Sequence, residues 1–94
     1  MPVTHYNEME EDRIRRSTHV VLRTLYRGQW SEVAVETPKN TPLVSMIGYA
    51  QHWVALKGKG RKIGIYLATA DDERVAMPLR HIPPVVQKIL EERT

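Results

Sequence analysis

The sequence predicts a mainly β fold with one C-terminal helix. The expected architecture is a small antiparallel barrel, SH3-like or Sm-like, or a strongly bent sheet of five or six strands. Between residues 19 and 79, short runs rich in β-branched and aromatic residues alternate with turns that contain glycine, proline or acids. One segment with the spacing of an amphipathic helix follows them. The chain of 94 residues suits one domain, expected over residues 17–94.

Residues 1–16 are expected to form a charged, flexible N-terminal arm. Residues 1–12 hold four acids and no Lys or Arg. Met9 and Ile14 give the arm almost no apolar face, so that packing cannot offset the entropy lost on ordering. The i,i+4 spacing of Asp12 and Arg16 would support a short helix within it.

The first strands form a hairpin. Residues 19–26, "HVVLRTLY", and residues 30–36, "WSEVAVE", have the composition and alternation of strands, with a turn at 27–29. Residues 37–42, "TPKNTP", are expected to form a loop. Residues 43–50 allow two interpretations, a strand bent at Gly48 or one turn of helix.

A second hairpin is predicted from residues 51–57, "QHWVALK", and residues 61–68, "RKIGIYLA". Its tip holds glycines among Lys57, Lys59, Arg61 and Lys62. By alternation Val54, Leu56, Ile63 and Ile65 would face the core, which places Trp53 and Lys57 on the outer face with Lys62, Gly64 and Tyr66.

The remaining segments complete the fold. Residues 69–73 form an acidic turn, and residues 74–79 an edge strand, because Pro78 cannot donate to a ladder. Residues 83–93 form a helix that begins with proline. Its apolar stripe, which needs the sheet for burial, consists of Val85, Val86, Ile89 and Leu90.

The composition argues against catalysis and against a metal or other cofactor. The chain has no cysteine, and its four histidines lack the HxH and HxxxH spacings of metal sites. No serine lies in a nucleophile-elbow context. The tip lacks the GxxxxGK[ST] pattern and precedes a strand, which excludes a nucleotide-hydrolysing P-loop. We therefore expect a protein without enzymatic activity.

The same features indicate a cytoplasmic protein. No apolar run approaches the roughly 20 residues that span a bilayer, and the N-terminus lacks the apolar middle of a signal peptide. The formal net charge of +3 hides an asymmetry, because the acids concentrated in residues 1–12 offset a more basic remainder. That remainder favours polyanions as partners.

The basic tip is the strongest candidate for function. Lys and Arg beside glycines can approach a phosphate backbone and release condensed counterions. Trp53 and Tyr66 on the neighbouring strands could stack on bases or enter a groove. The alternatives are a solvated turn for the tip and a covering role for Trp53 over the open side of the barrel.

Part of this region resembles a known family. Residues 33–84 resemble the small seven-kilodalton chromatin proteins of Crenarchaeota in Thr37-Pro38, Trp53-Val54-Ala55-Leu56, Lys59-Gly60-Arg61-Lys62 and Ile63-Gly64-Ile65-Tyr66. Leu79-Arg80-His81 weakly echoes an Arg-His pair of that family. The resemblance implies an SH3-like barrel that binds duplex DNA in the minor groove, with Ala55 or Leu56 as the intercalating wedge.

The leading hypothesis is a nucleic-acid-binding protein, with duplex DNA favoured over RNA or single strands. Its predicted contact residues are Trp53, Leu56, Lys57, Lys59, Arg61, Lys62, Tyr66 and Arg80. The alternative is a protein-interaction module (a small subunit, adaptor or viral regulator) that docks or dimerises through a sheet edge or the C-terminal helix. An Sm-like RNA-binding ring is a third hypothesis, although such rings carry their helix first.

Overall fold

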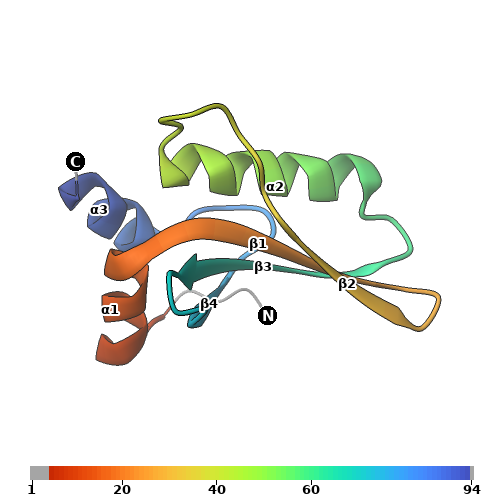
Figure 1. The fold of residues 1–94 in the computed structure, drawn as a ribbon, viewed down its shortest axis with the longest axis horizontal. Coiled ribbons are helices and arrows are strands. Elements are labelled where there is room, and N and C mark those ends of the chain that lie inside the picture. Colours follow the sequence, from red (N-terminus) through yellow and green to blue (C-terminus); the bar gives the residue numbers. More distant parts are fainter. Residues whose placement is uncertain (1–4, 94) are drawn as a thin grey trace.

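A computed structural model describes residues 5–93, which form one antiparallel sheet and three helices (Figure 1). The elements are α1 (Glu8–Arg16), β1 (Ser17–Tyr26), β2 (Gln29–Ala34), α2 (Leu43–Lys57), β3 (Lys62–Thr69), β4 (Arg74–Met77) and α3 (Pro84–Glu92). The sheet has four strands in the order β2-β1-β3-β4. It is open, with β2 and β4 as its edges, so the prediction of a closed barrel, and that of five or six strands, is wrong.

The first predicted hairpin is confirmed. β1 and β2 pair from Val21 opposite Ala34 to Tyr26 opposite Gln29, so that only two residues remain for the turn. These are Arg27 and Gly28, both with positive φ, as tight hairpins require. Figure 1 shows the turn projecting beyond the rest of the sheet.

Residues 43–57 form one continuous helix, which corrects the two strands or single helical turn expected there. The buried positions Ile47 and Ala50 and the partly buried Val54 follow helical spacing, so the alternation inferred around Trp53 had the wrong period. The sequence of this helix carries few of the signals that usually mark where a helix begins. Pro42 provides no side-chain cap, and no acid lies in the first turn.

The segments after α2 follow the prediction closely. β3 pairs with β1 on one side and with β4 on the other. Ile65 and Leu67 are buried, and Ile63 packs against the core, as expected from alternation. β4 is an edge strand that ends at Met77, one residue before Pro78.

The core lies between the sheet and the helices. α2 runs across one face of the sheet, and α1 and α3 lie near the end of the sheet away from the β1–β2 turn (Figure 1). The strands contribute every second residue to this face, because successive side chains of a strand point to opposite sides. The buried residues of this core cluster are Ile14, Val20, Leu22, Ile47, Ala50, Ile65, Leu67, Val75, Met77, Val86, Ile89 and Leu90.

Residues 8–16 belong to the folded domain, which corrects the expectation of a flexible arm for this part of the chain. Asn7 and Glu10 form a capping box, and Ile14 is fully buried. α1 packs against α3, β3 and β4. Residues 1–4 of the expected arm lie outside the described residues.

The predicted C-terminal helix is confirmed as α3. Of its stripe, Val86, Ile89 and Leu90 are buried and Val85 is half-buried, so the stripe completes the protein's own core. A dimer or a protein partner at this helix stays a prediction from the sequence. Within residues 5–93, no helix is long and apolar enough to cross a membrane.

Candidate nucleic-acid interface

Four positive side chains gather where α2 connects to β3. Lys57 ends α2, Lys59 and Arg61 lie in the connection, and Lys62 begins β3. All four residues are exposed. The expected basic tip is present, but it joins a helix to a strand rather than two strands.

A shallow hollow beside this connection brings three predicted contact residues together. This basic depression has a volume of about 850 Å³, and its cations are Lys59, Arg61 and Arg80. His52 of α2 also lines it. Among residues 5–93 no carboxylate contributes to the lining, so an anion bound here would meet only favourable charges.

Gln51 holds the two sides of the basic depression together. Its side-chain amide donates to the backbone oxygens of Pro78 and His81, at 3.1 and 2.8 Å. These bonds fix the segment that contains Arg80 against α2. Arg80 is thereby positioned near Lys59 and Arg61, although about twenty residues separate them in the sequence.

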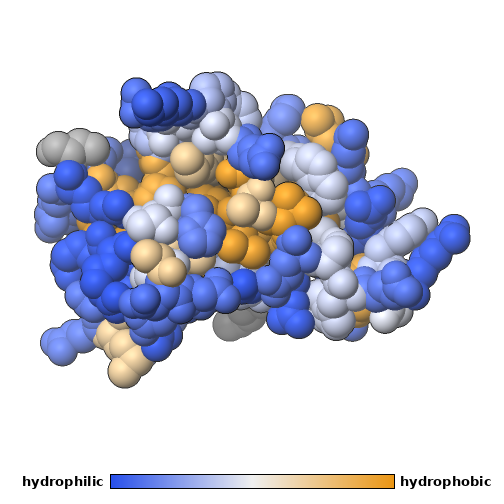
Figure 2. Space-filling model, in the orientation of Figure 1, coloured by the Kyte–Doolittle hydropathy of each residue, from blue (hydrophilic) through white to orange (hydrophobic). Residues whose placement is uncertain are grey.

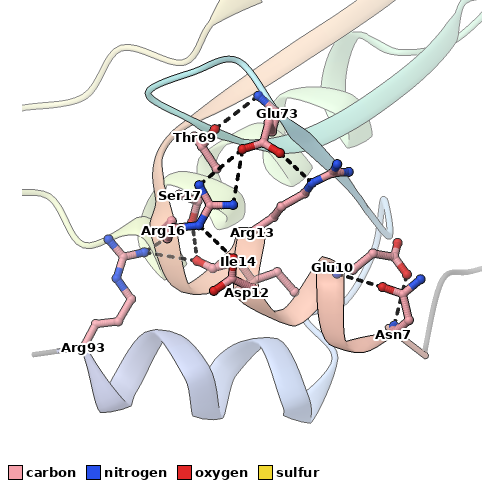
Figure 3. A network of polar contacts seen from close by, with 10 residues as sticks. All are labelled: Asn7, Glu10, Asp12, Arg13, Ile14, Arg16, Ser17, Thr69, Glu73 and Arg93. Carbon is pink, nitrogen blue, oxygen red and sulfur yellow. Dashed lines mark hydrogen bonds and ion pairs between the residues drawn. The ribbon is translucent and has the colours of Figure 1, made fainter.

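The carboxylates occupy a different part of the molecule. Glu73, in the turn after β3, lies 3.2 Å from both Arg13 and Arg16 of α1, and Arg16 also pairs with Asp12 at 2.8 Å (Figure 3). These contacts tie α1 to the β3–β4 turn. Arg13 and Arg16 are therefore paired with acids at this end of the protein.

A second network compensates the cations on the outer face of the sheet. Arg74 donates to both oxygens of Glu32 at 2.8 Å and also contacts Asp72. The hydrogen bonds from Arg74 lower the pKa of Glu32. Arg23 lies 3.7 Å from Glu32 and stacks over the ring of Trp30 at 4.3 Å. In contrast, among the described residues no ion pair forms at Lys57, Lys59, Arg61, Lys62 or Arg80.

Arg61 contacts aromatic rings instead. Its guanidinium lies 4.7 Å from the ring centre of Tyr26 and 5.8 Å from that of Trp53. Such cation–π contacts orient the guanidinium but leave its positive charge without a counter-charge. Arg61 can therefore still attract a phosphate.

Trp53 lines an apolar groove between α2 and the β1–β2 hairpin. The groove has a volume of about 640 Å³, and its aromatic walls are Tyr49 and Trp53, with Val33 opposite and Arg61 at one end. Tyr49 and Val33 are 57% and 61% exposed. Figure 2 shows apolar residues reaching the surface between α2 and the sheet.

Tyr66 is separated from Trp53 by the sheet, contrary to the sequence prediction. It pairs with Val21 on the face opposite α2 and lines an edge pocket of about 530 Å³ with Arg80 and His81. The ring of Tyr66 lies over Gly64, where an added Cβ atom would come within 2.7 Å of it. Gly64 and Tyr66 therefore share one face, as alternation predicts, whereas Trp53 does not lie on that face.

The structure thus brings together part of the predicted contact set. Lys59, Arg61 and Arg80 share the basic depression, and Trp53 lies beside Arg61. Leu56 is 68% exposed on α2 and lines neither the groove nor the depression, and its expected position in the core is wrong.

Three residues of this surface, Tyr26, Tyr49 and His52, were not predicted from the sequence. Tyr49 and Trp53 lie four residues apart, the spacing at which two side chains are close neighbours on one face of a helix. Recognition of α2 would have found this pair. Tyr26 could not have been linked to Arg61 without the tertiary structure.

Comparisons with models of known families, with curated proteins and with solved structures found no match. The resemblance of residues 33–84 to the crenarchaeal chromatin proteins therefore stays a prediction from sequence. The closed barrel that this resemblance implies is not present, because the sheet is open.

Proposed function

We propose that this protein is a non-enzymatic nucleic-acid-binding protein, with DNA as the favoured polyanion. The observation that supports the proposal best is the basic depression, in which Lys59, Arg61 and Arg80 converge without a carboxylate. Lys57 and Lys62 extend this charge on both sides of the α2–β3 connection. Lys and Arg side chains that neutralise phosphates release condensed counterions, which favours binding at low salt.

The separation of charge supports the same conclusion. The arginines that stabilise the fold, such as Arg13 and Arg74, are paired with carboxylates. Within residues 5–93, the cations around the α2–β3 connection form no such ion pairs. A cluster of uncompensated charge costs some self-repulsion, and a polyanionic partner would relieve it.

Binding to labelled DNA tests the proposal, with fluorescence anisotropy as the readout at low salt. Changing Lys59, Arg61 and Lys62 together to Ala is expected to abolish binding and to leave the melting temperature nearly unchanged. The matched control changes Arg15, Lys39 and Lys88 to Ala, which removes the same charge from α1, the loop before α2 and α3. Equal affinity of the two triple variants would contradict the proposal.

The second candidate function is a protein-interaction module that uses a sheet edge. β2 is exposed along all six residues and forms one edge of the sheet beside the apolar groove. An edge strand with free backbone groups can pair with an extended segment of another protein. Co-purification of a stoichiometric protein partner, together with no DNA binding at low salt, would favour this function.

A further inference from the structure

The groove, the basic depression and the edge pocket are three neighbouring hollows, here called the track, and consecutive hollows share a lining cation. Arg61 lines both the groove and the basic depression. Arg80 lines both the basic depression and the edge pocket. The two outer compartments each contain an aromatic ring, Trp53 in the groove and Tyr66 in the edge pocket.

We infer that this track binds a single-stranded nucleic acid, with a base stacked beside Trp53 in the groove and the phosphates over the basic depression. The inference rests on the proposed function and specifies its ligand. Proteins that bind single strands combine a cationic path for the backbone with aromatic rings for unpaired bases. A duplex keeps its base faces inside the helix and could use only the cations.

The groove has the surfaces that an unpaired base requires. Tyr49 and Trp53 lie four residues apart on α2 and both line the groove, Trp53 as a partly buried ring and Tyr49 as an exposed one. Val33 of β2 adds apolar lining, and Glu36 is the one acid among the lining residues within the described part of the chain. A planar base here would cover apolar surface that water now contacts.

Arg61 lies where the groove, which would hold a base, meets the basic depression, which would hold the phosphate of the same nucleotide. Its guanidinium contacts Trp53 on the side of the groove and shares the basic depression with Lys59 and Arg80. One nucleotide could therefore place its phosphate against Arg61 and Lys59 while its base enters the groove. This combination of charge and ring favours a nucleic acid over a purely apolar peptide.

Fluorescence of Trp53 tests the inference directly. The chain has two tryptophans, so the variant Trp30→Phe leaves Trp53 as the only reporter. A short oligothymidylate is expected to quench its emission and to bind at least as tightly as a duplex of the same length. Inorganic polyphosphate, which carries charge but no base, is expected to bind without quenching.

A second variant separates stacking from folding. Tyr49 is exposed, so Tyr49→Ala should leave the melting temperature nearly unchanged. It is expected to weaken oligothymidylate binding about tenfold, as loss of one stacking ring does, while affinity for duplex and for polyphosphate stays the same.

The outcomes distinguish the inference from the proposed function. Tighter duplex binding without quenching by the single strand would overturn the inference and leave nucleic-acid binding intact. Equal quenching by polyphosphate, or no selective loss in Tyr49→Ala, would also overturn it. Absence of binding to all three polyanions would overturn the proposed function itself.

Discussion

Arg61 and Arg74 show how one residue type takes two different roles in this protein. Arg74 lies between Glu32 and Asp72, and the hydrogen bonds that it donates to Glu32 raise its pKa, so its charge is used within the sheet. Arg61 lies over Tyr26 and Trp53 with no carboxylate within ion-pair distance among the described residues. The second arrangement leaves a positive charge free for a ligand.

Tyr6 provides a prediction on pH dependence. Its hydroxyl donates to the backbone oxygen of Ala76 at 3.1 Å, and burial, with the charge of Glu10, raises the pKa of Tyr6 to about 12. The unfolded chain should ionise Tyr6 near the ordinary value of 10.0, so its contribution is complete below pH 10 and is lost as pH rises toward 12.

Absorbance titration should therefore reveal a tyrosine with a pKa of about 12. Unfolding measurements should show that Tyr6→Phe lowers stability at pH 8 by about 1 kcal/mol and loses less stability than the parent between pH 10 and about 12. An equal alkaline loss in parent and variant would contradict the role assigned to Tyr6.

At the residue scale, local composition could predict the cations but not their aromatic neighbours. Lys57, Lys59, Arg61 and Lys62 are evident because four positive charges lie within six residues. The position of Arg80 beside them depends on the bonds of Gln51 to the segment after β4. Tyr26 reaches Arg61 from a strand more than thirty residues away, which no local pattern encodes.

At the element scale, α2 explains the largest difference between the prediction and the structure. Its sequence has Gly48, β-branched residues and one charged side chain, Lys57, and it lacks the i,i+4 ion pairs and the cap that identify helices. Burial of Ile47 and Ala50 against the sheet outweighs these weak propensities. The strands and α3 were predictable because their apolar spacing is regular.

α1 illustrates the opposite error, since two large apolar residues seemed too few to order a helix. The buried face needs only Ile14, because ion pairs to Glu73 and hydrogen bonds from Arg93 to the backbone oxygen of Ile14 and to Ser17 complete the contact (Figure 3). The partners lie about sixty to eighty residues away in sequence, so the arm could not be recognised as part of the domain.

The position of Ile14 makes a prediction on stability. Ile14→Ala should lower the free energy of unfolding by about 2–5 kcal/mol, the usual range for a large side chain removed from a core. Urea unfolding measures this loss, and the exposed neighbour Arg15 changed to Ala serves as the control. A flexible arm would predict no effect from either substitution.

At the scale of the whole molecule, the fold separates two regions of charge. At the end that contains α1 and the β3–β4 turn, Arg13, Arg16 and Arg74 are paired with acids. The region around the α2–β3 connection and Arg80 presents cations without such pairs. α2 crosses one face of the open sheet and ends at the basic depression, so the cations lie away from α1 and the β3–β4 turn.

The central claim is that the cations of the basic depression neutralise phosphates of a bound nucleic acid. The most direct measurement is the slope of the logarithm of DNA affinity against the logarithm of salt concentration. For the parent the slope should be steeply negative, and Lys59→Ala should reduce its magnitude by about 1, whereas Lys88→Ala on α3 should not change it. The same slope for Lys59→Ala and the parent would contradict the account.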